Sequence, residues 1–343
     1  MPRQTAPSPR LAKAVSRFSR CSVLVVGDVS LDELVWGRAC ALSPDSLAPV
    51  VRVTREEQRP GAAGAVAGML AGLGVNVHLV SVVGADEDGE RLRHALQDIG
   101  VGCEAIFSSR ARTTTRITRT YAQGMQVGHI ERAAHCPLVD DELRLSGHHI
   151  RSVASEIDAA VVVDDGKGVV TEELARLVID TCRDHDTPVV ESFATDWPSR
   201  ETSPDAVIVD YFGARPNDGA SSMHDSDPLI ERGGRESLDR SGVSSVLMYL
   251  RDKGLALFRK GHKKGRRYPL PPNVAIELTD AREAAVAVFS AALACGAPHH
   301  DAASLACCAL GLAASRVGPV WVDRRTLTSG ETGGRGPKRV GRS

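Results

Sequence analysis

The feature that most constrains the fold is an alternation of short, β-branched apolar runs with helical patterns. The first run spans residues 22–26 and ends at Gly27-Asp28; runs at residues 76–83 and 159–163 also end in glycine and aspartate. Buried parallel strands have this appearance, and helical crossovers connect them. The alternation predicts a doubly wound, mostly parallel α/β sheet. Ligands of such sheets bind at the carboxyl ends of the strands.

The amino-acid composition limits the classes of partner that we expect this chain to bind. The chain has 343 residues, is 42% hydrophobic, and carries 42 Lys and Arg against 43 Asp and Glu. This balance argues against a nucleic-acid surface. Residues 1–20 carry only positive charges without a long apolar core, and no later run is long enough to cross a membrane. We therefore expect a cytoplasmic protein with no membrane partner.

The cysteines and histidines carry no metal pattern. None of the eight cysteines forms a C-x-x-C pair, so we expect buried, reduced thiols. The adjacent pairs His148-His149 and His299-His300 cannot share a helix face, so we expect no metal site from them.

The chain divides into one domain with flexible ends. Residues 1–20 read as a disordered basic arm, 21–328 as the α/β domain, and 329–343 as a disordered Gly- and Arg-rich tail. Residues 214–242 are rich in Gly, Ser and Asp and read as a mobile insertion. Alternating strands within residues 33–58 predict a small β-lid, whose exposed edges could pair with a second copy in a homodimer.

Four segments carry a resemblance to a known family. They read GDVSLDELVWG from Gly27, LSPDSLAPVVRV from Leu42, RPGAAGAVAGMLAGLG from Arg59 and VVGADEDG from Val82. In this order and spacing they resemble the opening of PfkB/ribokinase-type sugar kinases. Within that family the chain resembles the heptose 7-phosphate kinase domain of the bacterial ADP-heptose pathway. The similarity is strong over residues 20–190 and weaker to about residue 325.

The resemblance implies a ribokinase-like, three-layer α/β/α domain with a small β-lid. It also implies an ATP-dependent carbohydrate kinase that transfers the γ-phosphate to a sugar hydroxyl with Mg²⁺. In the matching enzymes the first half binds the sugar, and the second half binds ATP and holds the chemistry.

On the sugar side, Asp28 and Asp32 match carboxylates that the family aims at sugar hydroxyls, which suits paired hydrogen bonds from vicinal diols. The alternative is that Asp28 caps the turn after its strand. Gly61 allows close approach of backbone to a ligand. Ala65 departs from the family, where an asparagine contacts the substrate.

Three cations could hold an anionic sugar. Arg116 and Arg119 lie in TTTRITR, which matches a stretch facing the sugar phosphate. Exposed charges on a half-wet strand are an equal alternative. Lys167, in DDGKG, matches a family loop near the substrate or phosphates.

On the ATP side, the family signature D-x-T-G-A-G-D lets successive N–H groups hold the transferring phosphoryl group, and its last aspartate takes the hydroxyl proton. Here the matching turn reads Thr-Asp-Ala-Arg-Glu. Asp280 and Arg282 replace the two glycines around Ala281, and Glu283 replaces the catalytic aspartate. Side chains at both glycine positions restrict the backbone and fill the space for a phosphate.

This turn has two other interpretations. Asp280 and Glu283 have the spacing of a capping box ahead of the following helix. Arg282 could instead supply positive charge to a phosphate. The resemblance implies that Asp280, Ala281 and Arg282 form a degenerate anion-binding loop, with Glu283 as a degenerate base.

At other positions too, this sequence lacks residues that the family uses on the ATP side. Tyr211 and Ala214 stand where the family has Asn and Glu, Tyr249-Leu250 stands for Thr-Arg, and Cys307 replaces an asparagine near the nucleotide. We favour a kinase-derived protein with impaired or lost phosphoryl transfer that binds a sugar or sugar phosphate. The alternative is an active kinase of heptose 7-phosphate or a related sugar, with ATP and Mg²⁺ as cofactors and Glu283 as base.

Overall fold

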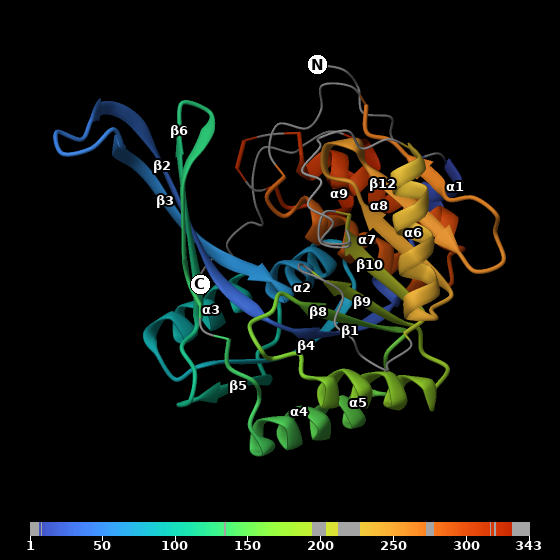
Figure 1. Cartoon of the computed structure of the whole chain (residues 1–343). Coiled ribbons are helices and arrows are strands. Elements are labelled where there is room, and N and C mark those ends of the chain that lie inside the picture. Colours follow the sequence, from blue (N-terminus) through green and yellow to red (C-terminus); the bar gives the residue numbers. More distant parts are fainter. Residues whose placement is uncertain are drawn as a thin grey trace.

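The computed structural model describes residues 7, 9–133, 135–193, 204–211, 227–271, 278–315, 317–318 and 320–330. Two sheets organise them: a nine-stranded sheet between two layers of helices, and a four-stranded sheet that projects from it as a lid (Figure 1). The ribokinase-like, three-layer α/β/α fold expected from the sequence is confirmed.

The nine-stranded sheet is parallel except at one end. Its order is β13-β12-β11-β10-β9-β8-β1-β4-β5, and only β11/β12 and β12/β13 pair antiparallel. The strands are β1 Ser22–Gly27, β4 Asn76–Gly84, β5 Ala105–Ser109, β8 Ala159–Asp164, β9 Val189–Phe193, β10 Ala206–Asp210, β11 Ser245–Tyr249, β12 Leu255–Arg259 and β13 Arg266–Tyr268. Since β1 lies between β4 and β8, the strand order reverses there, and a crevice is expected beyond its carboxyl end.

Helices cover both faces of this sheet. One core cluster joins alternate side chains of β1 and β8 to four helices: α2 Ala63–Gly72, α3 Glu87–Asp98, α7 Ala281–Ala294 and α8 His299–Ala313. Two clusters on the opposite face involve α4 Asp140–Val153, α5 Glu172–Arg183 and α6 Asp227–Ser241. The strands are buried on both faces, which explains their continuous apolar sequences.

Local capping fixes several helix starts. Asp86 accepts a hydrogen bond from the backbone N–H of Gly89 (2.9 Å) at the start of α3. Thr171 accepts one from Leu174 (3.2 Å) and caps α5, as its sequence position predicts. These caps set where each strand-end loop turns into its helix.

The lid is a four-stranded sheet with the order β3-β2-β6-β7. Its strands are β2 Val29–Leu42, β3 Pro49–Ala62, β6 Thr115–Ala122 and β7 Met125–Arg132. The hairpin of β2 and β3 extends beyond the predicted lid residues 33–58 at both ends. The tip of the lid reaches away from the helical layers (Figure 1).

The predicted ends of the domain need correction. Residues 9–20 are not a disordered arm, because α1 (Pro9–Val15) and a short 3₁₀ helix, η1 (Phe18–Arg20), bury Val15 and Phe18 completely in the main core. At the other end, α9 (Arg324–Ser329) closes the described part of the chain. The tail from residue 331 lies outside the described residues.

The predicted insertion also needs correction. Its second half is helix α6, where no helix was expected, and Ile230 and Leu238 on α6 pack against the sheet. Residues 214–226 lie outside the described residues. The other connection near this end is a short 3₁₀ helix, η2 (Arg251–Lys253), between β11 and β12.

The prediction that all cysteines are reduced is wrong for one pair. Cys21, ahead of β1, and Cys295, at the end of α7, form a disulfide with a Cα–Cα distance of 6.2 Å. Among the described residues, no helix has both the length and the apolar character needed to cross a bilayer.

Candidate functional site

The crevice beyond β1 is formed by closely packed strand ends. Gly27 ends β1 against β8, and a Cβ on Gly27 would lie 2.1 Å from the carbonyl oxygen of Val163. Only glycine therefore allows this approach. It brings Asp28 next to the loop of residues 164–169, which follows β8.

Asp28 is almost completely buried and holds that loop in place. Its Oδ2 accepts hydrogen bonds from the backbone N–H groups of Asp165 (2.9 Å) and Lys167 (3.1 Å), and its Oδ1 accepts one from Val169 (3.0 Å). Burial raises the pKa of Asp28, against the effect of these hydrogen bonds. Asp28 therefore holds a strand-end loop, as in the capping alternative, but the loop is the one after β8 and not the turn after its own strand. A sugar-binding role for Asp28 stays a prediction.

Asp32 lies at the base of the lid with its carboxylate fully engaged. Its Oδ1 accepts a hydrogen bond from the hydroxyl of Ser30 (2.7 Å), and its Oδ2 forms an ion pair with Arg119. Gly61 on β3, which pairs with Ser30, leaves room for this arrangement, since a Cβ there would lie 2.2 Å from Asp32 Oδ1. The predicted residues Asp32 and Gly61 are thus neighbours, and Asp32 neutralises one of the predicted cations.

Arg116 is held by a carboxylate that the sequence did not single out. Both oxygens of Glu33 accept from Arg116 Nη2 at 2.8 Å, and Asp88 lies 3.5 Å from Arg116 Nη1. Thr118 donates to Glu33 as well (2.9 Å). Burial would raise the pKa of Glu33, but the hydrogen bonds from Arg116 and Thr118 outweigh it and lower the pKa.

Lys167 also carries a partner. Its Nζ forms an ion pair with Glu131 of β7, and both side chains are partly exposed. Because β7 belongs to the lid, this pair joins the lid to the loop after β8. All three cations predicted for a sugar phosphate, Arg116, Arg119 and Lys167, are therefore ion-paired within the chain.

Asp280 precedes α7 in a left-handed backbone conformation, with φ 58° and ψ 7°. Glycine adopts this conformation without cost, and aspartate tolerates it better than most other residues that carry a side chain. The side chain of Asp280 makes no capping hydrogen bond, so the predicted capping box is wrong. Its carboxylate instead forms a buried ion pair with Arg59 of β3. Burial lowers the pKa of Arg59 to about 10.

The next turn of α7 holds a second set of ion pairs. Arg282 Nη2 lies 2.7 Å from Asp165 Oδ1 and 2.7 Å from Glu283 Oε1, and Arg282 Nε donates to the same Glu283 oxygen (3.0 Å). These carboxylates outweigh the effect of burial and raise the pKa of Arg282. The N–H of Ala281 donates to the carbonyl of Leu278 (3.1 Å). The chain's own groups therefore occupy much of this turn.

The other departures lie around this turn. The buried Tyr211 donates its backbone N–H to the carbonyl of Tyr249 (3.0 Å), and burial, followed by the charges of Glu283 and Asp210, raises the pKa of Tyr249. Ala214 lies outside the described residues, and Ala65 is buried on α2.

Cys307 is distinct from these, because it faces a cavity of about 290 Å³ between α8 and the segment after β13. Its thiol donates to the carbonyl of Tyr268 (3.2 Å), and burial raises the pKa of Cys307 to about 12. The thiol is therefore protonated at neutral pH and acts as a weak hydrogen-bond donor.

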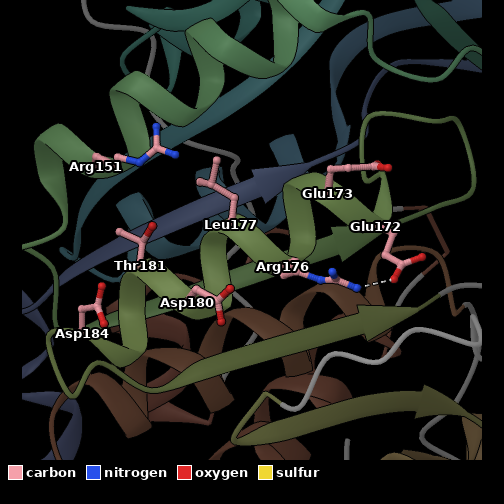
Figure 2. Close-up of a pocket in the computed structure, with 8 residues that line it drawn as sticks. All are labelled: Arg151, Glu172, Glu173, Arg176, Leu177, Asp180, Thr181 and Asp184. Atoms are coloured by element: carbon pink, nitrogen blue, oxygen red, sulfur yellow. Dashed lines mark hydrogen bonds and ion pairs between the residues drawn. The ribbon is translucent and has the colours of Figure 1, made fainter.

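A larger cavity of about 560 Å³ lies away from all of these residues, on the outer surface of α4 and α5 (Figure 2). It is lined by Arg151, Glu172, Glu173, Arg176, Leu177, Asp180, Thr181 and Asp184. Figure 2 shows Arg176 directed at Glu172, one turn away along α5. Pairs of this kind are ordinary on exposed helices. No strand-end residue contributes to this cavity, so it is separate from the candidate site.

The sequence interpretation missed the partners that complete the site. Glu33 alternates with Asp32 along the lid strand, and Glu131 lies on β7, a strand that was not predicted. Arg59 lies two positions before Gly61 and pairs with Asp32 across the lid hairpin, so its side chain lies beside the predicted residues. No local sequence pattern predicts the contact between Arg59 and Asp280.

Comparisons with known proteins identify the family of this chain. Residues 29–320 match the pfkB family of carbohydrate kinases. The chain is 34% identical over 308 residues to the bifunctional protein HldE of Geobacter metallireducens, covering 87% of this chain and 60% of HldE. It is 30% identical over 329 residues to the bifunctional protein HldE of Desulfatibacillum aliphaticivorans, covering 91% and 63%. The chain thus spans about three fifths of the length of these relatives.

Solved structures agree on the fold. Arabidopsis thaliana ribokinase complexed with ribose and ATP superposes with a TM-score of 0.65 at 18% identity, over 90% of this chain and 97% of the ribokinase. Escherichia coli phosphofructokinase-2 in complex with potassium gives 0.71 at 16% identity, over 90% and 96%. At such identities the likeness concerns the fold alone. Together with the family match, it means that this chain belongs to the pfkB family of carbohydrate kinases.

Proposed function

We propose that this chain is a sugar-binding pfkB homologue in which phosphoryl transfer is impaired or lost. The observation that carries the proposal is the set of ion pairs at the start of α7, where Asp280 binds Arg59 and Arg282 binds Asp165 and Glu283. A transferring phosphoryl group needs unpaired N–H groups and cations at such a turn. Here carboxylates of the chain itself already form ion pairs with the cations at this turn.

ATP and Mg²⁺ fit this turn poorly. Asp280 adds negative charge where the resemblance implies a phosphate, and the Ala281 N–H is bonded to Leu278. Asp165 and Glu283, which could approach a cation, share the guanidinium of Arg282. We therefore derive no reaction step through a nucleotide or a metal ion.

Glu283 would be a poorly prepared base. A general base must have a free lone pair within reach of the hydroxyl proton. Oε1 of Glu283 already accepts two hydrogen bonds from Arg282, at 2.7 and 3.0 Å, so Arg282 fixes the orientation of the carboxylate and Oε2 is the oxygen that would have to reach the hydroxyl proton. Its side chain is also one methylene longer than the aspartate of the family signature, and a displacement of roughly 1 Å can cost about 10²-fold in rate.

An active ATP-dependent kinase of heptose 7-phosphate or a related sugar is the second candidate. It is favoured by the backbone at Asp280, which keeps a conformation typical of glycine, and by the likeness to HldE over 87% of the chain. For this activity a substrate would have to draw Arg282 away from Glu283.

Transfer of labelled γ-phosphate from ATP tests the two candidates. The assay measures transfer to a panel of heptoses, hexoses and their phosphates, with and without Mg²⁺, and ATP is titrated calorimetrically in parallel. We expect turnover at least 10³-fold below that of an active sugar kinase assayed alongside. Robust turnover that Glu283→Gln abolishes would refute the proposal.

A restored variant gives the converse test. Asp280→Gly, Arg282→Gly and Glu283→Asp together return the signature glycines and aspartate. Because the substitutions remove the carboxylate and the guanidinium that occupy this turn, we expect the triple variant, once circular dichroism shows it to be folded, to bind ATP more tightly than the parent protein. Unchanged ATP affinity would place the defect outside this turn, and the ion pairs of Asp280 and Arg282 would not be its cause.

The lid suggests a homodimer. Its exposed surface carries large apolar side chains, namely Leu42, Leu47, Val50, Val53, Met125, Val127 and Ile130. Exposed apolar groups concentrated on one sheet are typical of interaction surfaces. We propose that a second copy covers them in the cytoplasm. Sedimentation velocity should find a dimer that Leu47→Asp with Val53→Lys dissociates; a monomeric parent protein at micromolar concentration would contradict this.

A further inference from the structure

The three cations predicted for a sugar phosphate are neutralised by three different carboxylates. Arg116 and Arg119, both on β6, bind Glu33 and Asp32, which are neighbours on β2. The third pair, Lys167 with Glu131, joins the loop after β8 to strand β7 of the lid. The sugar side therefore presents ion pairs, and these three cations contribute no surplus positive charge.

Strand register builds the central pair. β2 and β6 are parallel, with Leu31 opposite Arg116 and Glu33 opposite Thr118. The side chains of Arg116 and Thr118 therefore converge on one carboxylate, with all three hydrogen bonds between 2.8 and 2.9 Å. Both side chains of the ion pair are mostly buried, at 21% and 17% exposed. Such a pair is a fixed part of the sheet rather than a loose surface contact.

The adjoining cavity is also electrically balanced. It has a volume of about 520 Å³ and is lined by Asp86, Glu87, Asp88, Arg91, Thr113, Thr114, Arg116 and Arg132. Three carboxylates thus face three guanidiniums. Arg132 is the exposed member, and in the part of the chain that the structure describes no carboxylate pairs with it. A phosphate entering here would find one unpaired cation among several negative charges.

Ion pairs select hydroxyls over phosphates. A phosphate dianion can bind Arg116 only by displacing Glu33, which would then remain half-buried, unpaired and close to the new anion. A sugar hydroxyl can donate to a carboxylate and accept from a guanidinium without separating the pair. The same argument applies to Asp32 with Arg119.

We propose that the sugar side of this chain takes an unphosphorylated sugar or polyol and discriminates against the corresponding sugar phosphate. The inference rests on the proposed sugar-binding function and specifies its substrate class. Discrimination comes from Glu33, Asp32 and Glu131, which occupy the cations that would otherwise recognise a phosphate.

Calorimetric titration of the full chain with matched ligands tests this inference. Free hexoses and heptoses are compared with their own terminal monophosphates at fixed ionic strength. We expect at least one free sugar to saturate the protein, with its monophosphate binding at least 10-fold more weakly. A monophosphate that binds more tightly than its free sugar would overturn the inference and leave the sugar-binding proposal standing. No saturation by any member of the panel would overturn both.

A charge-removing variant tests the stated cause. Glu33→Gln removes the carboxylate that binds Arg116 Nη2 and leaves only Asp88, 3.5 Å from Nη1, so we expect the ratio of monophosphate to free-sugar affinity to rise at least 10-fold. Glu172→Gln, which breaks the exposed pair with Arg176 on α5, is the matched control and should leave the ratio unchanged. An unchanged ratio in Glu33→Gln would refute the mechanism. If Glu33→Gln does not fold by circular dichroism, Glu131→Gln, on the exposed strand β7, carries the same comparison through Lys167.

Discussion

The ion pair between Arg59 and Asp280 gives a sharp test, because both side chains are almost completely buried, at 4% and 5% exposed. Removing one partner of a buried pair leaves an uncompensated charge and costs about 3–5 kcal/mol. In Asp280→Gly, the left-handed backbone at φ 58° becomes unstrained, which returns about 1 kcal/mol. We therefore expect Asp280→Gly to lower the free energy of unfolding by about 2–4 kcal/mol.

The double variant separates this pair from its surroundings. Arg59→Met alone strands Asp280 and should cost a similar amount. Arg59→Met with Asp280→Gly removes both charges and should lie within about 1 kcal/mol of the parent protein, since buried pairs replaced by apolar groups are often neutral. The two single effects should therefore be strongly non-additive.

Urea unfolding followed by far-UV circular dichroism measures each free energy by linear extrapolation. Glu172→Gln, in the exposed pair on α5, serves as the control and should change the free energy of unfolding by less than about 1 kcal/mol. Full stability of Asp280→Gly, or additive losses in the double variant, would refute the reasoning that a buried pair joins β3 to α7.

Three further predictions concern stability. The pKa of Glu33 is lowered below its ordinary 4.5, so its ion pair with Arg116 stabilises the fold above that pH. This stabilisation is lost as the pH falls through the folded pKa. The unfolding free energies of the parent protein and of Glu33→Gln should therefore converge in acid. Reducing the disulfide between Cys21 and Cys295 should lower the melting temperature. In the chain-entropy account, closing a loop over a sequence separation of 274 stabilises the folded state by about 5 kcal/mol. A melting temperature that dithiothreitol does not change would contradict this. Gly27→Ala places a Cβ 2.1 Å from the oxygen of Val163 and should cost about 3 kcal/mol or more in urea unfolding, whereas parent-like stability would show that the strands can separate there.

The sheet was predictable because its signals are local. A β-branched run followed by Gly27 and Asp28 predicts a strand end, and Thr171 predicts the start of α5, where it caps the helix. For residues 9–20 the prediction of a disordered arm relied on their positive charges and did not use the spacing of their apolar residues. Leu11, Val15 and Phe18 lie four and three positions apart, which is the pattern of one helix face, and all three contact the main core.

For the candidate site, the sequence predicts which residues lie near the strand ends, but it does not predict their side-chain contacts. The residues expected at the strand ends do gather there, because parallel strands bring their carboxyl ends to one edge. The partners of these residues come from other elements: Glu131 from an unpredicted strand, and Arg59 from a segment remote from Asp280 in sequence. Side-chain pairing across such distances depends on the assembled sheet order, and no local pattern encodes it.

The two sheets end in different ways, and the difference restricts how copies of this chain can associate. The last strand at one edge of the nine-stranded sheet, β13, has three residues, two of which are Arg266 and Arg267. A short, positively charged edge is a poor template for a strand of another molecule. Growth of the main sheet past β13 is therefore discouraged, whereas the lid, with the order β3-β2-β6-β7, presents the long strand β3 at one of its edges.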